Sequence, residues 1–362
     1  MIVVAFCSLM ALLLTYLESR NRLKNGMKLG FALVTLLGVI HYNYGNDYMA
    51  YYDIYKSIVN VPFNFSNVIG GYVYKEPGWA LINYAFKPIG GFFMMVAVLN
   101  IIQNVIYYRF IKNNVARSWW PVAIFIYLFS SNFYLLNFSM MRQGLVISIF
   151  LWLWKYIKNR RWGIALIGLI ACSLIHTSSI ILIPFAFWGF LRMRNGKIWA
   201  MIFLCSFFLL WGAEDLLNEI FNTVLIFEEF KDYSEYFKDA ESVEYGIGFL
   251  LNMLPFFVSI YYLCQNKLES GTAHQMVALA TVGFIILPFG QILPLVGRIG
   301  MYFNVFSIGA FAISYSSVKN TLIRKGLIFI FIFMTLYDYW MFFNAGVFSK
   351  SYSQFHTIFS AL

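Results

Sequence analysis

The sequence predicts an all-α polytopic membrane protein with about twelve transmembrane spans, some of them short or re-entrant, and two external loops. Hydrophobic residues make up 61% of the 362 positions, and charged residues only 12%. Soluble domains carry about 25% charged residues, so this chain has about half the charge that a water-facing surface needs. A soluble enzyme, a nucleic-acid-binding protein and a disordered scaffold are therefore excluded. We expect residues 1–362 to form a single integral membrane domain.

The basic residues are segregated along the chain, which predicts its orientation. Most of the 26 Lys and Arg residues gather in six loops that hold few acids: Arg20 to Lys28, Arg109 to Arg117, Lys155 to Arg161, Arg192 to Lys197, Lys267, and Lys319 to Lys325. Such loops lie on the cytoplasmic side. The other loops are acidic, so both termini and the acidic loops are expected outside. The net charge of +10 then reflects topology, and no nucleic-acid partner is expected.

The first segments of the chain are a span and an aromatic loop. Residues 1–17 lack a basic start and a small-residue cleavage site, which predicts an uncleaved span. Residues 41–76 form the predicted external aromatic loop, where tyrosines cluster at Tyr42, Tyr44, Tyr48, Tyr51, Tyr52 and Tyr55. Four of them follow helical spacing. They fit either an interfacial aromatic belt or a sugar-binding surface, and Asp47 fits either a helix cap or a carboxylate that orients a sugar.

Residues 76–111 are too long for one ordinary span. Glu76 and Pro77 predict an acidic N-cap followed by proline at the first helical position. The short helix that they start should end at Lys87-Pro88, and Gly90-Gly91 should turn the chain into a full span. A half-helix of this kind typically lines a water-filled site. Glu76 is therefore either a cap or a carboxylate that takes part in chemistry.

Residues 162–190 are apolar, yet basic clusters flank them on both sides. A single long helix would put one cluster on the wrong face of the membrane. Two short helices that meet near His176-Thr177-Ser178-Ser179 satisfy the charge rule, with Thr or Ser capping the second helix. His176 is then either a hydrogen-bonded packing residue or a catalytic base inside the protein.

Two arginines lie near the predicted external surface, at the start of spans. Arg142 opens a span that runs to Trp154, and Arg298 precedes a span that begins at Ile299. An arginine near the membrane is costly unless it is paired or solvated. Each side chain either snorkels to the interface or binds an anion, since a guanidinium matches phosphate oxygens. Between them, residues 213–245 form the predicted second external loop, which is acidic and partly amphipathic.

These segments together resemble the EpsG-like branch of the Wzy-type bacterial polysaccharide polymerases, which include the O-antigen polymerases. The resemblance covers roughly residues 40–300. It rests on the blocks Tyr44-Gly45-Asn46-Asp47-Tyr48, Glu76-Pro77-Gly78-Trp79, Met141-Arg142-Gln143-Gly144, Lys158-Asn159-Arg160-Arg161, His176-Thr177-Ser178-Ser179 and Gly297-Arg298. The Arg-Gln-Gly and His-Thr-Ser-Ser blocks at this separation are its most specific part.

The resemblance implies a metal-independent, cofactor-free glycosyltransferase in the bacterial inner (cytoplasmic) membrane, with its active site facing the periplasm. It implies transfer of a growing glycan from undecaprenyl pyrophosphate to a new lipid-linked repeat unit, with membrane lipid and a chain-length regulator protein as further partners. Arg142 and Arg298 are expected to hold pyrophosphate, and His176 to be the base, with Asp47 or Glu76 in reserve. The expected sugar-binding residues are Tyr48, Tyr51, Trp79 and Gln143.

Other activities remain open at this stage. An O-antigen ligase uses the same lipid donor and needs the same arginines. A lipid-linked oligosaccharide flippase or transporter would spread ionisable residues through its spans and show an internal repeat, neither of which the sequence has. A membrane acyltransferase would also use an Arg and a His, but it gives no role to the tyrosine and acidic loops.

Overall fold

The computed structural model describes residues 1–190, 197–202, 204–205, 247–265, 268, 271–286, 289 and 294–360. The regular secondary structure of the described residues is helical apart from two strands of two residues each, and the predicted polytopic all-α fold is consistent with this. It divides into two compact units, residues 1–191 with 332–362, and residues 192–331. The expected single domain over residues 1–362 stays a prediction.

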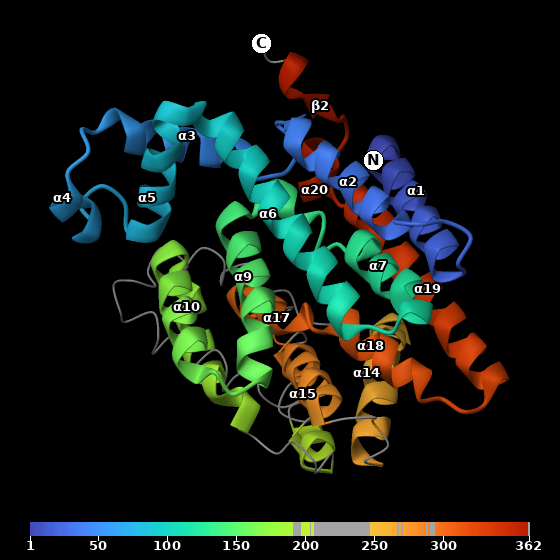
Figure 1. The fold of residues 1–362 in the computed structure, drawn as a ribbon. Coiled ribbons are helices and arrows are strands. Elements are labelled where there is room, and N and C mark those ends of the chain that lie inside the picture. Colours follow the sequence, from blue (N-terminus) through green and yellow to red (C-terminus); the bar gives the residue numbers. More distant parts are fainter. Residues whose placement is uncertain are drawn as a thin grey trace. The chain divides into compact units, whose positions relative to one another are not determined.

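The first unit contains the segments that the sequence singled out between residues 41 and 190 (Figure 1). Its elements in chain order are α1 (Ile2–Ser19), α2 (Gly26–Ile40), β1 (His41–Tyr42), α3 (Tyr48–Asn60), α4 (Phe65–Ile69), α5 (Pro77–Phe86), η1 (Lys87–Ile89), α6 (Gly91–Asn114), η2 (Arg117–Trp119), α7 (Trp120–Phe129), α8 (Leu136–Ser139), α9 (Met141–Lys158), α10 (Trp162–Ile175) and the 3-10 helix η3 (Thr177–Phe190). The C-terminal elements α20 (Gly346–Ser351), β2 (His356–Thr357) and η5 (Ile358–Ser360) belong to it too.

The second unit is also helical where the structure describes it. It contains α14 (Ile247–Cys264), α15 (Gly271–Ile286), α17 (Pro294–Asn304) and α18 (Ser307–Ser316), and α15 packs against the other three. Helix α19 (Thr321–Asn344) crosses the boundary between the two units.

Among the described residues, three helices are long and apolar enough to cross a membrane: α1, α6 and α19. The pair Val296–Asn304 and Ser307–Ser316, bent by 53°, adds a fourth if it is one span. Helices α2, α10 and α15 and the 3-10 helix η3 are apolar but have only 14 to 16 residues, which is less than the roughly 20 that a bilayer requires. Short apolar helices agree with the expected short spans, whereas the total of about twelve is not confirmed.

The predicted breaks in the chain occur where the sequence placed them. Glu76 is the N-cap of α5 and Pro77 its first residue. Gly90 has a φ of 119°, in the left-handed region that favours glycine, and the chain turns there into the long helix α6. The predicted pair of short helices is also confirmed, because α10 ends at Ile175 and η3 begins at Thr177.

The two ends of the described chain lie together within the first unit. The N-terminal ammonium of Met1 donates a hydrogen bond to the carbonyl oxygen of Tyr352, at 3.2 Å. Strands β1 and β2 pair in antiparallel fashion, with His41 opposite Thr357. These contacts agree with termini on one side of the membrane, and the side itself stays a prediction.

Helices α6, α7 and α8 share a buried set of uncharged polar side chains, which we call the neutral network: Asn100, Asn104, Tyr127 and Asn137. The Tyr127 hydroxyl donates to Asn104 Oδ1 at 2.9 Å, and Asn137 Nδ2 donates to that hydroxyl at 3.4 Å. Each of the four side chains is at most 2% exposed. Buried polar groups need such partners, since an unpaired one costs about 1–3 kcal/mol.

Candidate functional site

Glu76 is the centre of a charged group in the first unit. It stands at the N-cap of α5, but its side chain makes no capping hydrogen bond there. Both carboxylate oxygens instead bind residues from later in the chain, Arg142 at Oε2 and His176 at Oε1. The Glu76 side chain is only 2% exposed. We call Glu76, Arg142 and His176 the ionic cluster.

Three other side chains bind Arg142. It lies in the first turn of α9, where a cation is unfavourable because the helix N-terminus is itself positive. Its Nη1 group donates to Glu76 and, at 2.7 Å, to the Tyr74 hydroxyl, while Nε donates to the Tyr51 hydroxyl at 3.3 Å. The guanidinium carbon also lies 5.4 Å from the ring centre of Tyr51, a cation–π distance. No described residue accepts a hydrogen bond from Nη2, and the side chain remains 17% exposed.

His176 meets the same carboxylate from the break between α10 and η3. Its Nδ1 lies 2.9 Å from Glu76 Oε1. The backbone N–H of Thr177, at the start of η3, donates to the same oxygen at 3.0 Å, and the Thr177 hydroxyl lies 3.4 Å away. Because a carboxylate accepts only, a neutral imidazole must carry its proton on Nδ1. Nε2 is then an acceptor, and no described residue occupies it.

The carboxyl of Glu76 stays ionised in this setting. Burial alone would raise its pKa. The hydrogen bond from His176, the charge of Arg142 and the Thr177 N–H outweigh burial and lower the pKa to about 2. A group with this pKa and with both oxygens bound fits an anchor for its neighbours better than a proton acceptor.

Gly78 lets α5 approach α10, which brings Glu76 to His176. A Cβ atom on Gly78 would lie 2.9 Å from the backbone carbonyl of Leu174, closer than such contacts occur. Helices that approach this closely need a small residue at the contact. The sequence Glu-Pro-Gly therefore sets a cap, a helix start and a close contact in three consecutive positions.

The residues expected to bind sugar are largely inside the protein. Tyr48 and Trp79 are fully buried, and Trp79 packs edge-on against Tyr51 with ring centres 5.6 Å apart. Tyr51 in turn binds Arg142, and Gln143 is buried beside it on α9. Asp47 is at the N-cap position of α3, where its backbone N–H donates to Ser139 Oγ at 3.1 Å. The sugar-binding roles, and the role of Asp47, stay predictions.

Arg298 belongs to the second unit, on helix α17, which begins at Pro294, earlier than expected. Its partnership with Arg142 in binding pyrophosphate stays a prediction. The acidic loop of residues 213–245 lies outside the described residues. Where the structure describes the chain, it holds no group of three or more His, Cys, Asp or Glu side chains arranged for a metal ion. Catalysis without a metal stays a prediction.

The sequence did not predict two groups that bind the ionic cluster: the Tyr74 hydroxyl, which binds Arg142, and the backbone N–H of Thr177, which binds Glu76. Tyr74 lies in the loop before α5 and has no distinctive spacing. A backbone N–H carries no sequence signal at all. Tyr51 was expected to bind sugar, yet its hydroxyl accepts a hydrogen bond from Arg142. Nothing local in the sequence reveals such long-range contacts.

The fold and the site define a helical, multi-pass membrane protein in which one buried carboxylate joins a guanidinium and an imidazole. Comparison with models of known protein families identifies the family within this class of membrane proteins. A family model described as the EpsG family matches residues 27–356, and the chain belongs to that family of Wzy-type exopolysaccharide polymerases. The family suggests a polysaccharide polymerase that acts on lipid-linked glycans. Neither the curated proteins nor the solved structures gave a match.

Proposed function

We propose that this protein polymerises undecaprenyl-pyrophosphate-linked oligosaccharide repeat units at the external face of the cytoplasmic membrane. A hydroxyl of a new lipid-linked repeat attacks the anomeric carbon of the growing glycan. The bond from that carbon to the pyrophosphate oxygen breaks, and the pyrophosphate lipid leaves with the bonding electrons. The ionic cluster carries this proposal, because it combines a cation for the leaving group with a base for the incoming hydroxyl.

Arg142 is the proposed pyrophosphate-binding residue. Its position at the start of α9 adds the positive end of a helix to the guanidinium charge. Three oxygen partners hold the side chain, so little reorganisation is needed when charge develops on the leaving oxygen. Donors that are preorganised in this way typically contribute about 3–4 kcal/mol each to transition-state stabilisation.

His176 is the proposed base. Glu76 holds Nδ1, which leaves the lone pair of Nε2 for the proton of the attacking hydroxyl. The carboxylate then acts as it does in other His–carboxylate pairs, by fixing the tautomer and stabilising the imidazolium that forms. In this proposal Glu76 is a positioning residue and His176 is the group that touches substrate.

The charges of the cluster favour this sequence of events. With a neutral imidazole, the positive Arg142 and the negative Glu76 cancel. When His176 takes the hydroxyl proton, the cluster gains one positive charge as negative charge appears on pyrophosphate. Two opposite charges that develop together in a site of low dielectric stabilise each other more than they would in water.

Gene deletion tests the function in the cell. We expect surface polysaccharide on a gel to collapse from a ladder to molecules that carry a single repeat unit. Loss of all attached polysaccharide would indicate a ligase instead. Precursor trapped inside the cell would indicate a flippase, and an unchanged ladder would contradict the proposal.

A reconstituted assay tests the chemistry. Purified protein in vesicles, given only the undecaprenyl-pyrophosphate-linked repeat unit, should make long chains with no nucleotide sugar added. Arg298→Lys in the same assay tests whether a second guanidinium is required. If Arg298→Lys retains full chain length, the pyrophosphate is held without that residue.

A further inference from the structure

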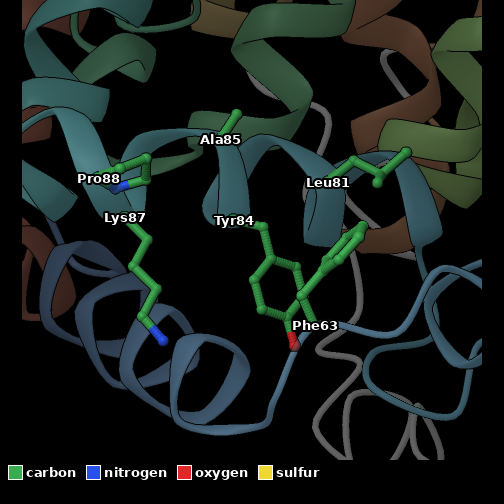
Figure 2. Close-up of a pocket in the computed structure, with 6 residues that line it drawn as sticks. All are labelled: Phe63, Leu81, Tyr84, Ala85, Lys87 and Pro88. Atoms are coloured by element: carbon green, nitrogen blue, oxygen red, sulfur yellow. The ribbon is translucent and has the colours of Figure 1, made fainter.

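An apolar groove runs along the side of α5, which is the helix that begins next to Glu76. It has a volume of about 670 Å³. Its lining residues, which define the α5 groove, are Phe63, Leu81, Tyr84, Ala85, Lys87 and Pro88. Figure 2 shows Lys87 and Pro88 on one side, with Tyr84, Phe63 and Leu81 on the other. Five of these six side chains are apolar or aromatic, so the groove suits a hydrocarbon.

Polar contacts hold the groove in shape. The Lys87 ammonium donates to the carbonyl oxygen of Val59 at 2.6 Å, and the Tyr84 hydroxyl donates to that of Val61 at 3.0 Å. The rings of Phe63 and Tyr84 meet edge-on, with centres 5.1 Å apart. These contacts tie the end of α3 and the loop after it to α5. A preformed groove loses less entropy when a ligand binds.

The groove and the ionic cluster are two parts of one helix. Glu76 immediately precedes the first residue of α5, and Lys87 follows its last residue. Ten helical residues rise about 15 Å, and Leu81 lies only one turn beyond Pro77. A lipid whose phosphates bind Arg142 therefore needs only the first few carbon atoms of its chain to reach the groove.

We propose that the α5 groove binds the polyisoprenyl chain of the pyrophosphate-linked substrate. The inference rests on the proposed function and names the part of the substrate that this surface recognises. The apolar lining excludes the glycan. No lining residue is acidic, so the groove holds no charge that would repel a lipid with an anionic head group. The groove thereby directs the lipid away from the site while its pyrophosphate stays at the ionic cluster.

Photolabelling tests the proposal. The probe is a polyprenyl pyrophosphate without glycan that carries a benzophenone near its head group, added to the full-length protein in phosphatidylcholine nanodiscs. We expect labelled peptides from residues 63–88, and competition by unlabelled undecaprenyl pyrophosphate but not by excess phosphatidylglycerol. Equal competition by phosphatidylglycerol would mean that the groove holds ordinary membrane lipid, which overturns the proposal.

Filling the groove gives a second test. Ala85 is exposed, so Ala85→Trp should fold and block the groove, and Ala85→Leu is a milder variant. We expect labelling to fall and the KM for lipid-linked repeat to rise about tenfold, because losing two buried methylenes corresponds to about that factor. Ile167→Trp, at an apolar position of α10 that is 71% exposed, is the matched control.

The outcomes separate the groove from the chemistry. If both Ala85 variants polymerise with normal KM while Arg142→Lys is inactive, the proposed function stands and the groove proposal fails. If Arg142→Lys makes full-length chains while the probe still labels the groove and Ala85→Trp abolishes that labelling, the groove binds a polyisoprenyl lipid and the proposed chemistry fails.

Discussion

The first unit places polar side chains inside an apolar protein in two different ways. The neutral network has no formal charge and is sealed from solvent. The ionic cluster has two opposite charges and an imidazole, and two of its three members are partly exposed. A sealed neutral group links helices, whereas a charged group that is open on one side retains atoms that can meet a substrate. On the proposed function the neutral network is structural and the ionic cluster functional, so substitutions in the two groups should affect different quantities.

The largest expected effect is that of His176→Gln. The variant loses the imidazole that we propose as the acceptor of the hydroxyl proton, so turnover in the reconstituted assay should fall by about 10²–10⁴-fold. His356, which is exposed near the C-terminus, supplies the control His356→Gln, with turnover unchanged. Full activity of His176→Gln would move the base to Asp47 or Glu76.

Arg142→Lys should reduce turnover by about 10²–10³-fold. Lysine keeps the charge but cannot reach Glu76, Tyr51 and Tyr74 together, because it lacks the guanidinium fork. Arg161→Lys, at an exposed position, should leave turnover at the wild-type level. A fully active Arg142→Lys would show that a single point charge suffices and that the fork has no role.

Glu76→Gln should lower the free energy of unfolding by about 3 kcal/mol, since it leaves a half-buried guanidinium without its counter-ion. The pKa of Glu76 is lowered from the ordinary 4.5 to about 2. The stability difference between wild type and variant is therefore fully present above about pH 4.5 and shrinks as the pH falls toward 2. Thermal melting in detergent across this range measures it. If the stability difference between wild type and Glu76→Gln disappears already near pH 6, Glu76 is not the group that titrates.

Gly78→Ala should disturb the approach of α5 to α10 and cost about 1–3 kcal/mol, as overpacking typically does. Turnover should fall as well, because Glu76 moves away from His176. The control is Gly163→Ala on α10, where a Cβ would meet nothing within 4 Å. This second variant should be neutral or up to about 1 kcal/mol more stable. If the two alanine variants have the same stability and the same turnover, the site does not depend on the close contact between α5 and α10.

The smallest expected effects come from single hydroxyls, one in each polar group. Tyr74→Phe removes a partner of Arg142 and should lower kcat/KM about tenfold with little loss of stability. Tyr127→Phe, in the neutral network, should lower the free energy of unfolding by about 1 kcal/mol and leave kcat/KM unchanged. Tyr72→Phe, at a side chain that is 85% exposed, should change neither. If Tyr127→Phe lowers kcat/KM while Tyr74→Phe lowers only the stability, the neutral network is the functional group and the ionic cluster the structural one.

Local sequence signals were sufficient for much of the helical framework. Pro77 favours a helix start, because its missing N–H is not needed at the first helical position, and Gly90 allows a turn that other residues resist. The break at His176 followed from basic residues on both flanks of an apolar stretch. The expected total of about twelve spans is not confirmed. Hydropathy alone is a weak guide to that number, because a short apolar helix and a full span give similar hydropathy but differ in length across a bilayer.

The site was only partly predictable, for a physical reason. Arg142, His176 and Glu76 attracted attention as charged or titratable groups in apolar surroundings. Their pairing depends on contacts between residues 66 and 100 positions apart, and helical periodicity carries no information on such contacts. For the same reason, a cap was a sound interpretation of Glu76. Its backbone takes the cap position, while its side chain turns to partners that only the fold supplies.

The position of Glu76 constrains how the chain can be made. The carboxylate is synthesised well before α9 and the segment at residues 176–177 emerge from the ribosome. Until then it lacks the guanidinium, the imidazole and the backbone N–H that later surround it. A lone anion in hydrocarbon is costly, so until those partners are in place we expect the carboxyl either to stay in contact with water or to take up a proton. The buried, ionised state of Glu76 therefore depends on partners that are synthesised later than Glu76 itself.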